Sequence, residues 1–393
     1  MGRPIAVEEE LVCRLAAVVG DVFVQPRFLS LALPTMPLSA DLPSDPAQEI
    51  RVSAVALRDL LVRIYVRMGM FKVEAEMAAD RQLEADLRGL RSHGSRGTPR
   101  YVRAMDVGDI DPRGQILTVV KTPALAVLDG GRQMGHVAGT RAMNLAIELA
   151  REVGTGTVAV RNSHHFGAAS VYALLAAREG MIGYCATSTG RASVAAHGSR
   201  SAAVANNAFA WAAPSRTGAP FCLDMSCAVS SWSKIETLGQ YGQPLPENWA
   251  LDAQGQPTLD PAAARVLLPA AGPRGFGLAW QSSLVAGALV GGKLPLHKRA
   301  HPEADESEHF FYVIDIARFG AVDQFYNEVD RTADEVRALP AAPGHSHVWL
   351  PGDREWQRAR EWEAQGIPLH RSHLDELAEV ARKYKFPIPW EQA

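Results

Sequence analysis

The sequence predicts an α/β (α+β) protein. Between residues 116 and 274, short apolar runs alternate with helical segments, as in strands and helices packed in layers. From Val52 to about Met105 the pattern is helical, with apolar residues at helical spacing from Leu57 to Met68. The chain has 393 residues and is 47% hydrophobic, which supports a large core, expected in two lobes.

The elements follow from apolar runs and their flanking residues. A helix is expected at 73–87, and strands at 124–128, 157–160, 182–186, 208–213 and 221–224. The run at 276–290, closed by two glycines, predicts a buried helix, and 310–316 predicts another strand. Ser372 is expected to cap the last helix. Residues 1–49 are punctuated by prolines and predict a separate N-terminal extension, either an arm on a partner subunit or a loose tail.

Composition indicates which kinds of partner and which cellular compartment to expect. The net charge of −3 gives no general attraction to nucleic acid or to an acidic membrane, and no apolar run reaches membrane length. The start Met-Gly-Arg-Pro is a poor signal peptide. Four cysteines without a C-x-x-C pair predict reduced thiols and a cytoplasmic protein.

A turn with two adjacent imidazoles is the most informative stretch. Arg161-Asn-Ser-His-His-Phe-Gly-Ala-Ala-Ser170 joins a predicted strand to a predicted helix. Gly167 would let a ligand approach the backbone, and the helix N-terminus would offer N–H groups to an anion. Because histidine moves protons near neutral pH, a nucleotide phosphate and a reacting carbonyl could meet here. The alternative is a loop whose histidines only bond backbone.

A third histidine follows the helix expected at 73–87. In Arg88-Gly-Leu-Arg-Ser-His-Gly-Ser95, the Ser92 hydroxyl could orient the His93 imidazole or share its proton. Ser92 lies on no Gly-x-Ser-x-Gly elbow, so it is not expected to be a hydrolase nucleophile. The alternative for His93 is a helix C-terminal cap.

Two other kinds of site are not expected. No G-x-G-x-x-G follows a strand and opens a helix, which argues against an ordinary Rossmann domain. Adjacent histidines on a turn diverge, and the sequence has no H-E-x-x-H or third ligand at useful spacing. The sequence therefore predicts no metal site.

Together these segments resemble the type-2 malate/L-lactate dehydrogenase family, which includes sulfolactate and ureidoglycolate dehydrogenases, diketogulonate reductase and cyclic-imine reductases. The resemblance runs from about Ile50 to the C-terminus and depends on the order and spacing of short motifs. They are Glu84-Ala-Asp-Leu-Arg-Gly-Leu-Arg-Ser-His-Gly94 with Pro99-Arg-Tyr101, Val160-Arg-Asn-Ser-His-His-Phe-Gly167, Leu223-Asp-Met-Ser226 with Lys234-Ile235, Gly275-Phe-Gly-Leu-Ala279, His309-Phe-Phe311, and Leu350-Pro-Gly-Asp353 with Gly366-Ile-Pro-Leu369.

The resemblance implies a non-Rossmann nucleotide-binding domain with a mixed sheet at 116–274. Residues 50–115 and 275–393 would form a helical cap and dimerisation domain, and the protein would be a homodimer that uses NAD or NADP. The residues implied to contact the cofactor are His165, Phe166, Gly167, Ala168, Ala169, Thr189, Asp224, Met225, Ser226 and Arg274. Arg274 stands where relatives usually carry lysine and keeps the positive charge.

The implied reaction is hydride transfer between the nicotinamide and C2 of a 2-oxo or 2-hydroxy acid, with a histidine as general acid/base. In some relatives the histidine matching His93 donates the proton, with the serine matching Ser92 as a relay. In others the donor matches His165. We favour His93. Lys234 could position or polarise the substrate, and its alternative is a surface lysine on a helix.

Two departures from the family pattern concern the substrate. Relatives usually carry Ser-His-Gly-x-x-Arg, whose arginine can clamp a carboxylate with two hydrogen bonds. Here that position is Gly97, and Arg96 stands one place earlier. Asn206 replaces a threonine that touches substrate in relatives. We therefore expect these three residues to shape substrate binding, and pyruvate and oxaloacetate to be poor substrates.

Two alternatives to a 2-hydroxy-acid dehydrogenase stay open. One is a cyclic imine (ketimine) reductase, in which the donor protonates nitrogen. The other is a nucleotide-binding protein without turnover, against which the retained Ser92, His93, His165 and Asp224 argue.

Overall fold

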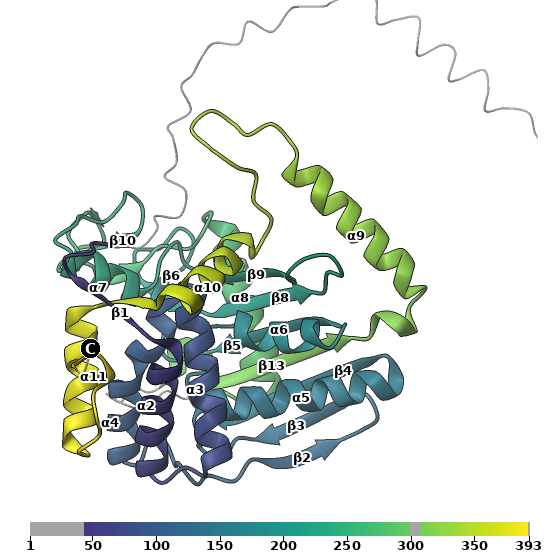
Figure 1. Cartoon of the computed structure of the whole chain (residues 1–393), viewed down its shortest axis with the longest axis horizontal. Helices are drawn as coiled ribbons and strands as arrows, with labels where there is room; N and C mark the ends of the chain where they lie inside the picture. The colour runs from purple at the N-terminus through teal and green to yellow at the C-terminus, as the bar shows by residue number, and fades with distance from the viewer. Residues whose placement is uncertain (1–42, 299–306, 392–393) are drawn as a thin grey trace, which may run out of the picture. The chain divides into compact units, whose positions relative to one another are not determined.

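The largest sheet is mixed, as the family resemblance implies. The computed structural model describes residues 43–298 and 307–391, so residues 1–42 of the expected extension lie outside the described part. Seven strands form the sheet in the order β2-β3-β4-β13-β5-β8-β9, with β3 and β4 parallel and the other neighbours antiparallel (Figure 1). Their bounds are β2 Leu117–Lys121, β3 Leu125–Asp129, β4 Thr155–Ser163, β5 Ile182–Ser188, β8 Ala208–Ala213, β9 Phe221–Ser226 and β13 Ser307–Ile314.

All six predicted strands are present within this sheet, and β2 is an addition. Every residue of β2 is exposed, so the strand buries no apolar face that a sequence pattern could mark. The position of β13 differs from the expected domain boundaries, because it comes from 275–393 yet lies between β4 and β5. Long-range pairing of this kind leaves no local signal.

Two helices cover one face of the sheet. α5 (Gly135–Val153) packs on β4 and β13, and α6 (Ser170–Arg178) packs on β5 and β8 (Figure 1). Small residues let these layers approach closely: a Cβ at Gly156 of β4 would lie 2.0 Å from the carbonyl oxygen of Ala146 on α5. The close packing of these helices on the sheet therefore fixes the position of the turn that joins β4 to α6.

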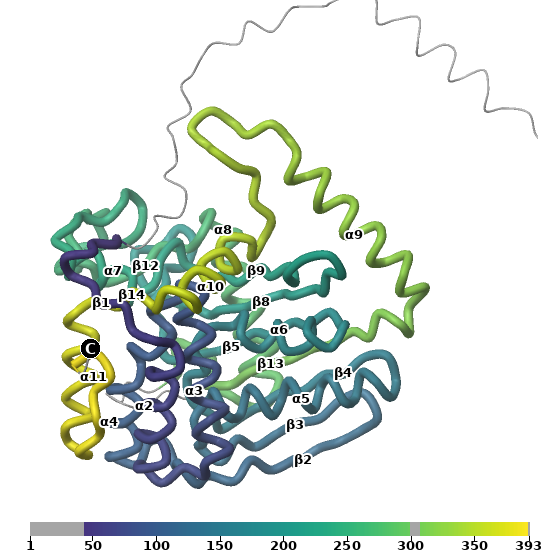
Figure 2. The backbone as a smooth tube through the Cα atoms, viewed as in Figure 1, coloured from purple at the N-terminus to yellow at the C-terminus, as the bar shows by residue number. Residues whose placement is uncertain are grey.

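A second core lies in a helical layer made from both ends of the described chain. It contains α2 (Ala54–Arg67), α3 (Lys72–Leu87), α4 (Thr98–Asp106) and α11 (Arg371–Lys383). The predicted stripe is confirmed, because Leu57, Leu60, Leu61 and Ile64 are fully buried here. β1 (Glu49–Val52) pairs antiparallel with β14 (Ile367–His370), so the purple and yellow ends of the trace run side by side (Figure 2).

The remaining elements surround these two layers. A five-stranded sheet has the order β11-β10-β12-β6-β7, with bounds Pro257–Thr258, Ala250–Leu251, Val266–Leu267, Val194–Ala195 and Ala202–Val204. The other helices are α7 (Trp232–Gln240), α8 (Pro273–Ser282), α9 (Val322–Arg337) and α10 (Asp353–Gln365). Short turns of helix are η1 Arg91–His93, η2 Ser95–Gly97, η3 Ser283–Gly287, η4 Ala288–Val290, η5 Pro295–His297, η6 Ile316–Arg318 and η7 Pro389–Glu391.

Two helix predictions were wrong in part. The run at 276–290 is not one buried helix: α8 ends at Ser282 and a π turn and a 3₁₀ turn follow, with Trp280, Leu284 and Leu289 43%, 42% and 66% exposed. The last helix begins at Arg371, and its cap is His370, whose Nδ1 accepts a hydrogen bond from the Ser372 N–H. The imidazole thus takes the capping role expected of a hydroxyl.

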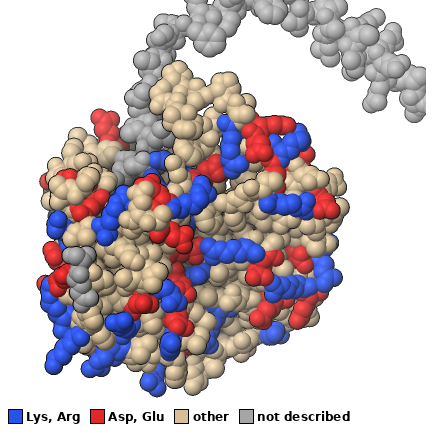
Figure 3. All heavy atoms as spheres, in the orientation of Figure 1, with Lys and Arg blue, Asp and Glu red and all other residues tan. Residues whose placement is uncertain are grey.

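Acidic and basic side chains are interspersed over the face shown in Figure 3. Among the described residues no helix is both long and apolar enough to cross a membrane.

Candidate active site

A buried carboxylate on α3 shapes the turn that carries His93. Asp86 accepts a hydrogen bond from the Ser95 N–H at 2.8 Å, and a Cβ at Gly94 would lie 1.9 Å from the Asp86 Oδ1. Only glycine at position 94 lets the chain pass this close to the carboxylate. Burial raises the pKa of Asp86 to about 7, although its hydrogen bonds to Ser95 oppose that shift. The Ser-His-Gly motif therefore forms a tight turn that packs against the buried Asp86 side chain.

Two hydroxyl–imidazole pairs face one another in the site. The Ser92 hydroxyl lies 2.8 Å from Nδ1 of His93, and the Tyr101 hydroxyl lies 2.7 Å from Nδ1 of His165. The two imidazole rings stack with centroids 5.8 Å apart and planes at 24°. Because each Nδ1 is engaged by a hydroxyl, Nε2 is the ring nitrogen left on each histidine for a reacting group.

Both histidines are neutral at pH 7. Burial lowers the pKa of His93 to about 4, and the positive charges of Arg100 and Lys234 add to the shift. Burial and Arg100 also hold the pKa of His165 well below its usual value. A neutral imidazole with its Nε2 available can accept a proton or, in the other tautomer, donate one.

The pairs open onto a cavity of about 750 Å³ between the helical layer and α7. Three arginines line it at spacings of four and three residues, which places them along one side of η2 and α4. The lining residues are Ser92, His93, Arg96, Gly97, Arg100, Tyr101, Arg103, His165, Trp232, Ser233, Glu236, Gly239, Gln240 and Glu376. Cationic side chains beside two imidazoles suit an anionic substrate.

Arg96, which stands one place before the position of the missing arginine, contacts α7. Its Nη1 donates to the Thr237 hydroxyl at 2.6 Å, and its Nη2 lies 3.5 Å from a carboxylate oxygen of Glu236. At Gly97 a Cβ would lie 2.7 Å from the Tyr101 ring. The Tyr101 ring, whose hydroxyl is bonded to His165, thus occupies the space that a side chain at position 97 would need.

Asn206 bridges two loop segments. Its side-chain NH₂ donates to the Ser230 carbonyl, and its oxygen accepts from the Ala228 N–H. It is absent from the lining of the 750 Å³ cavity. Lys234 lies in the first turn of α7. Its charge adds to the lowering of the His93 pKa by burial, and it opposes the larger effect of burial, which raises the pKa of Asp224.

The residues expected around a cofactor meet at the start of α6, at the carboxyl end of β9. Asp224 accepts a hydrogen bond from the Ser170 N–H at 2.9 Å, so its carboxylate caps the helix that was expected to offer its N–H groups to an anion. Phe166, Ala168 and Ala169 are buried, with Phe166 stacked on His309 at 4.6 Å. This part of the turn can meet a ligand only through its backbone.

The other expected cofactor residues lie at the ends of two strands and at the start of a helix. Thr189 follows β5, and its hydroxyl is 3.0 Å from that of Ser307. Met225 and Ser226 end β9, and the exposed Arg274 lies in the first turn of α8.

A buried arginine near Asp224 is suited to an anionic group. Arg88 is 1% exposed and its guanidinium lies over the Trp356 ring at 4.7 Å, yet its Nε and Nη1 have no hydrogen-bond partner among residues 43–298 and 307–391. Its charge lowers the pKa of Asp224, against the larger effect of burial. A nucleotide phosphate is the kind of group that such an arginine binds.

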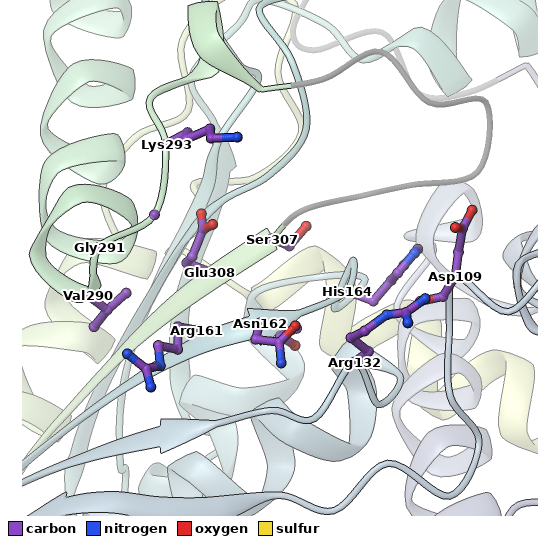
Figure 4. Close-up of a pocket in the computed structure, with 12 residues that line it drawn as sticks. Asp109, Arg132, Arg161, Asn162, His164, Val290, Gly291, Lys293, Ser307 and Glu308 are labelled. Carbon is purple, nitrogen blue, oxygen red and sulfur yellow. The ribbon is translucent and has the colours of Figure 1, made fainter.

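His164 faces a different pocket from His165. A second cavity, of about 520 Å³, is lined by His164 together with Arg132, Arg161 and Asn162 (Figure 4). The adjacent imidazoles therefore diverge as expected, and only His165 shares a cavity with His93.

Sequence reasoning missed three residues around the histidines. Tyr101 and Arg100 belong to the Pro99-Arg-Tyr101 motif, whose short distance from His93 was a usable signal. His136, behind Tyr101, lies in a helix with no motif to mark it.

Known dehydrogenases resemble this chain in sequence. The family described as malate/L-lactate dehydrogenase matches residues 52–378. Malate dehydrogenase of Pyrococcus abyssi is 34% identical over 345 residues, which are 85% of this chain and 95% of the relative. L-sulfolactate dehydrogenase of Methanocaldococcus jannaschii is 34% identical over 332 residues, 83% of this chain and 95% of the relative.

Solved structures show the same likeness. Malate dehydrogenase from Entamoeba histolytica superimposes with a TM-score of 0.83 at 29% identity, covering 87% of this chain and all of that one. Delta1-piperideine-2-carboxylate reductase from Pseudomonas syringae gives 0.74 at 27% identity, covering 84% of this chain and all of that one. The fold is that of oxidoreductases of the dehydrogenase type. The chain belongs to the malate/L-lactate dehydrogenase family.

Proposed function

We propose that the protein transfers a hydride between NAD or NADP and C2 of a 2-oxo/2-hydroxy acid or a related polar carbonyl compound. The observation that carries this is the facing pair of hydroxyl-bound histidines, His93 and His165, in a cavity lined by arginines. Proton transfer at the substrate oxygen needs such a group. Two of the relatives are named for malate and sulfolactate, which supports a 2-hydroxy acid as the substrate class.

The nicotinamide, when bound, supplies or accepts the hydride. The turn from His165 to Ala169, the β9 end from Asp224 to Ser226, Thr189 and Arg274 would hold the cofactor, with Arg88 available to a phosphate. In the oxidative direction, Nε2 of a neutral histidine takes the hydroxyl proton while the hydride leaves C2. Ser92 fixes Nδ1 of His93 for that role, Tyr101 does the same for His165, and we keep His93 as the favoured donor. Lys234 would orient or polarise the substrate.

Binding and turnover can be tested separately. Calorimetry with NADH and NADPH is expected to show roughly micromolar binding of one of them, weakened in Asp224→Ala and retained in Asp224→Asn, which still caps α6. Absence of heat with either nucleotide at sub-millimolar concentration contradicts the cofactor assignment. Oxidation of the bound nucleotide is then screened against 2-oxo acids.

A cyclic imine reductase is the second candidate. It is favoured by the structural likeness to the piperideine-carboxylate reductase and by the absence of an arginine at Gly97. The same histidine would protonate nitrogen in place of oxygen. Faster nucleotide oxidation with cyclic imines than with any 2-oxo acid selects this reaction.

We also propose a cytoplasmic homodimer. Trp280, Leu284 and Leu289 leave an apolar strip exposed on one chain, and a second copy would cover it. Cys185, Cys222 and Cys227 are buried free thiols, which suits a reducing compartment. Sedimentation at micromolar concentration is expected to give the dimer mass, and a monomer contradicts the proposal.

A further inference from the structure

A third histidine, His136, lies beside Tyr101 and the turn that bears His165. His136 is the second residue of α5 and is 1% exposed. Neither of its ring nitrogens has a conventional hydrogen-bond partner in the part of the chain that the structure describes. Burying a polar ring without such partners is unfavourable, and an aliphatic side chain would pack here at lower cost. The imidazole at this position therefore calls for an explanation beyond packing.

The turn that carries His165 is built around this ring. Gly167 has φ +79°, and a Cβ there would lie 2.7 Å from Nε2 of His136. The Cα hydrogen of Gly167 consequently points at Nε2, where it can act as a weak donor to the ring lone pair. On the other side, a Cβ at Gly135 would lie 2.0 Å from the His164 carbonyl oxygen. Glycine at both positions lets the start of α5 pack directly against the turn that bears His165.

His136 also meets the residue that bonds His165. Its ring lies 5.2 Å from the Tyr101 ring at 79°, an edge-to-face contact. The Tyr101 hydroxyl is 2.7 Å from Nδ1 of His165. One buried ring thus touches both Tyr101 and the turn that bears His165.

The surroundings keep the ring uncharged. Burial lowers the pKa of His136 to about 3, and Arg100, Arg81, His93 and His309 around it act in the same direction. A charged ring here would be repelled by the guanidinium groups of Arg100 and Arg81.

We propose that His136 is a positioning residue for the reaction proposed above, on which this inference depends. Its neutral ring fixes Tyr101 against the His165–Gly167 turn, so that the Tyr101 hydroxyl holds His165 in a single tautomer. His136 touches no substrate and acts only through Tyr101 and the turn.

Two substitutions at position 136 separate ring shape from bulk. His136→Phe keeps a ring edge against Tyr101, and His136→Leu removes it. The Leu variant is expected to lose at least about tenfold in kcat, with unchanged nucleotide affinity, a displaced pH profile and ¹⁵N shifts of His165 that report two tautomers. The Phe variant is expected to stay within about threefold of the unsubstituted protein. A Leu variant with unchanged kcat, pH profile and ¹⁵N shifts overturns the proposal.

A glycine pair gives a second test that does not touch His136. Gly167→Ala would push a methyl group toward Nε2, while Gly180→Ala carries similar strain at φ +74° and only meets the Tyr326 hydroxyl at 3.5 Å. We expect tautomer mixing at His165 in the first variant alone, and equal spectra for both contradict the inference. The ¹⁵N readout needs no substrate, so it remains decisive if no 2-oxo acid is turned over, which would count against the proposed function instead.

Discussion

The hydroxyl of Tyr101 lies 2.7 Å from Nδ1 of His165, as the Ser92 hydroxyl does at 2.8 Å from Nδ1 of His93. Each imidazole of the site is thus oriented by a hydroxyl from the same short segment, η1 to α4. The two histidines differ in their supports: a neighbour in sequence holds His93, and a residue 64 positions away holds His165.

Tyr101→Phe removes the hydroxyl and keeps the ring. We expect kcat to fall by about ten- to a hundredfold, because the His165 tautomer is no longer selected, with nucleotide affinity unchanged. Steady-state kinetics and calorimetry check this. Tyr384→Phe, which loses a hydroxyl on the helical layer away from the cavity, is the control and is expected to keep full activity.

His93→Ala is expected to lower kcat by at least about a hundredfold with little change in nucleotide binding. His164→Ala is expected to matter far less than His165→Ala, because His164 faces the other cavity. Equal losses for His164→Ala and His165→Ala would show that the wrong imidazole has been placed in the reaction.

Gly97→Arg restores the residue that relatives usually carry, yet we expect it to lower activity. The new side chain would meet the Tyr101 ring at 2.7 Å and displace the hydroxyl from His165. A fall in kcat of at least about tenfold for every substrate is the expected kinetic result. Improved turnover of pyruvate with an undiminished kcat would mean that the ring moves aside freely.

Arg100→Ala is expected to raise KM for an anionic substrate more than Arg96→Ala does. Arg100 influences the pKa of both cavity histidines, which places its charge near the reacting groups, and the Arg96 guanidinium is directed toward Thr237 on α7. The loss of a charged hydrogen bond costs about 1.5–3 kcal/mol, which is one to two decades in kcat/KM. A larger rise in KM for Arg96→Ala than for Arg100→Ala would contradict this prediction and identify Arg96 as the residue that binds the substrate carboxylate.

Acid is expected to destabilise the fold through its buried histidines. The pKa values of His93, His136 and His373 are lowered to about 4, 3 and 3, while the unfolded chain protonates near 6.5. The unfolded state therefore binds more protons below pH 6.5, and the free energy of unfolding falls as the pH drops toward 3. Asp86, with its pKa raised to about 7, acts in the opposite sense between about pH 4 and 7.

Denaturant unfolding across this range measures the balance. His373→Gln is expected to flatten the decline, since one of the three histidines no longer takes up a proton. Asp86→Asn is expected to steepen it by removing the opposing group. A free energy of unfolding that is constant from pH 7 to 4 in the unsubstituted protein would contradict these assignments.

The central strands and the histidine pair were predictable because their signals are local. Apolar runs mark β4 and β5, and the Ser-His-Gly motif places Ser92 beside His93. The insertion of β13 and the contact between Tyr101 and His165 depend on residues distant in sequence. The spacing of apolar residues does not indicate such pairing. His136 shows the limit most clearly, because its place is defined by two glycines that the sequence alone cannot bring together.

The pairing of β1 with β14 has a consequence for how the chain is made. Gln48 and His370 are hydrogen-bonded although 322 positions separate them. At roughly 5–20 residues per second, a ribosome takes on the order of 15–65 seconds to deliver the second partner. During that interval the first strand and the central sheet, which also awaits β13, stay incomplete. A nascent chain stalled before residue 300 would expose both gaps, which makes it a natural client for chaperones that bind unpaired strand edges.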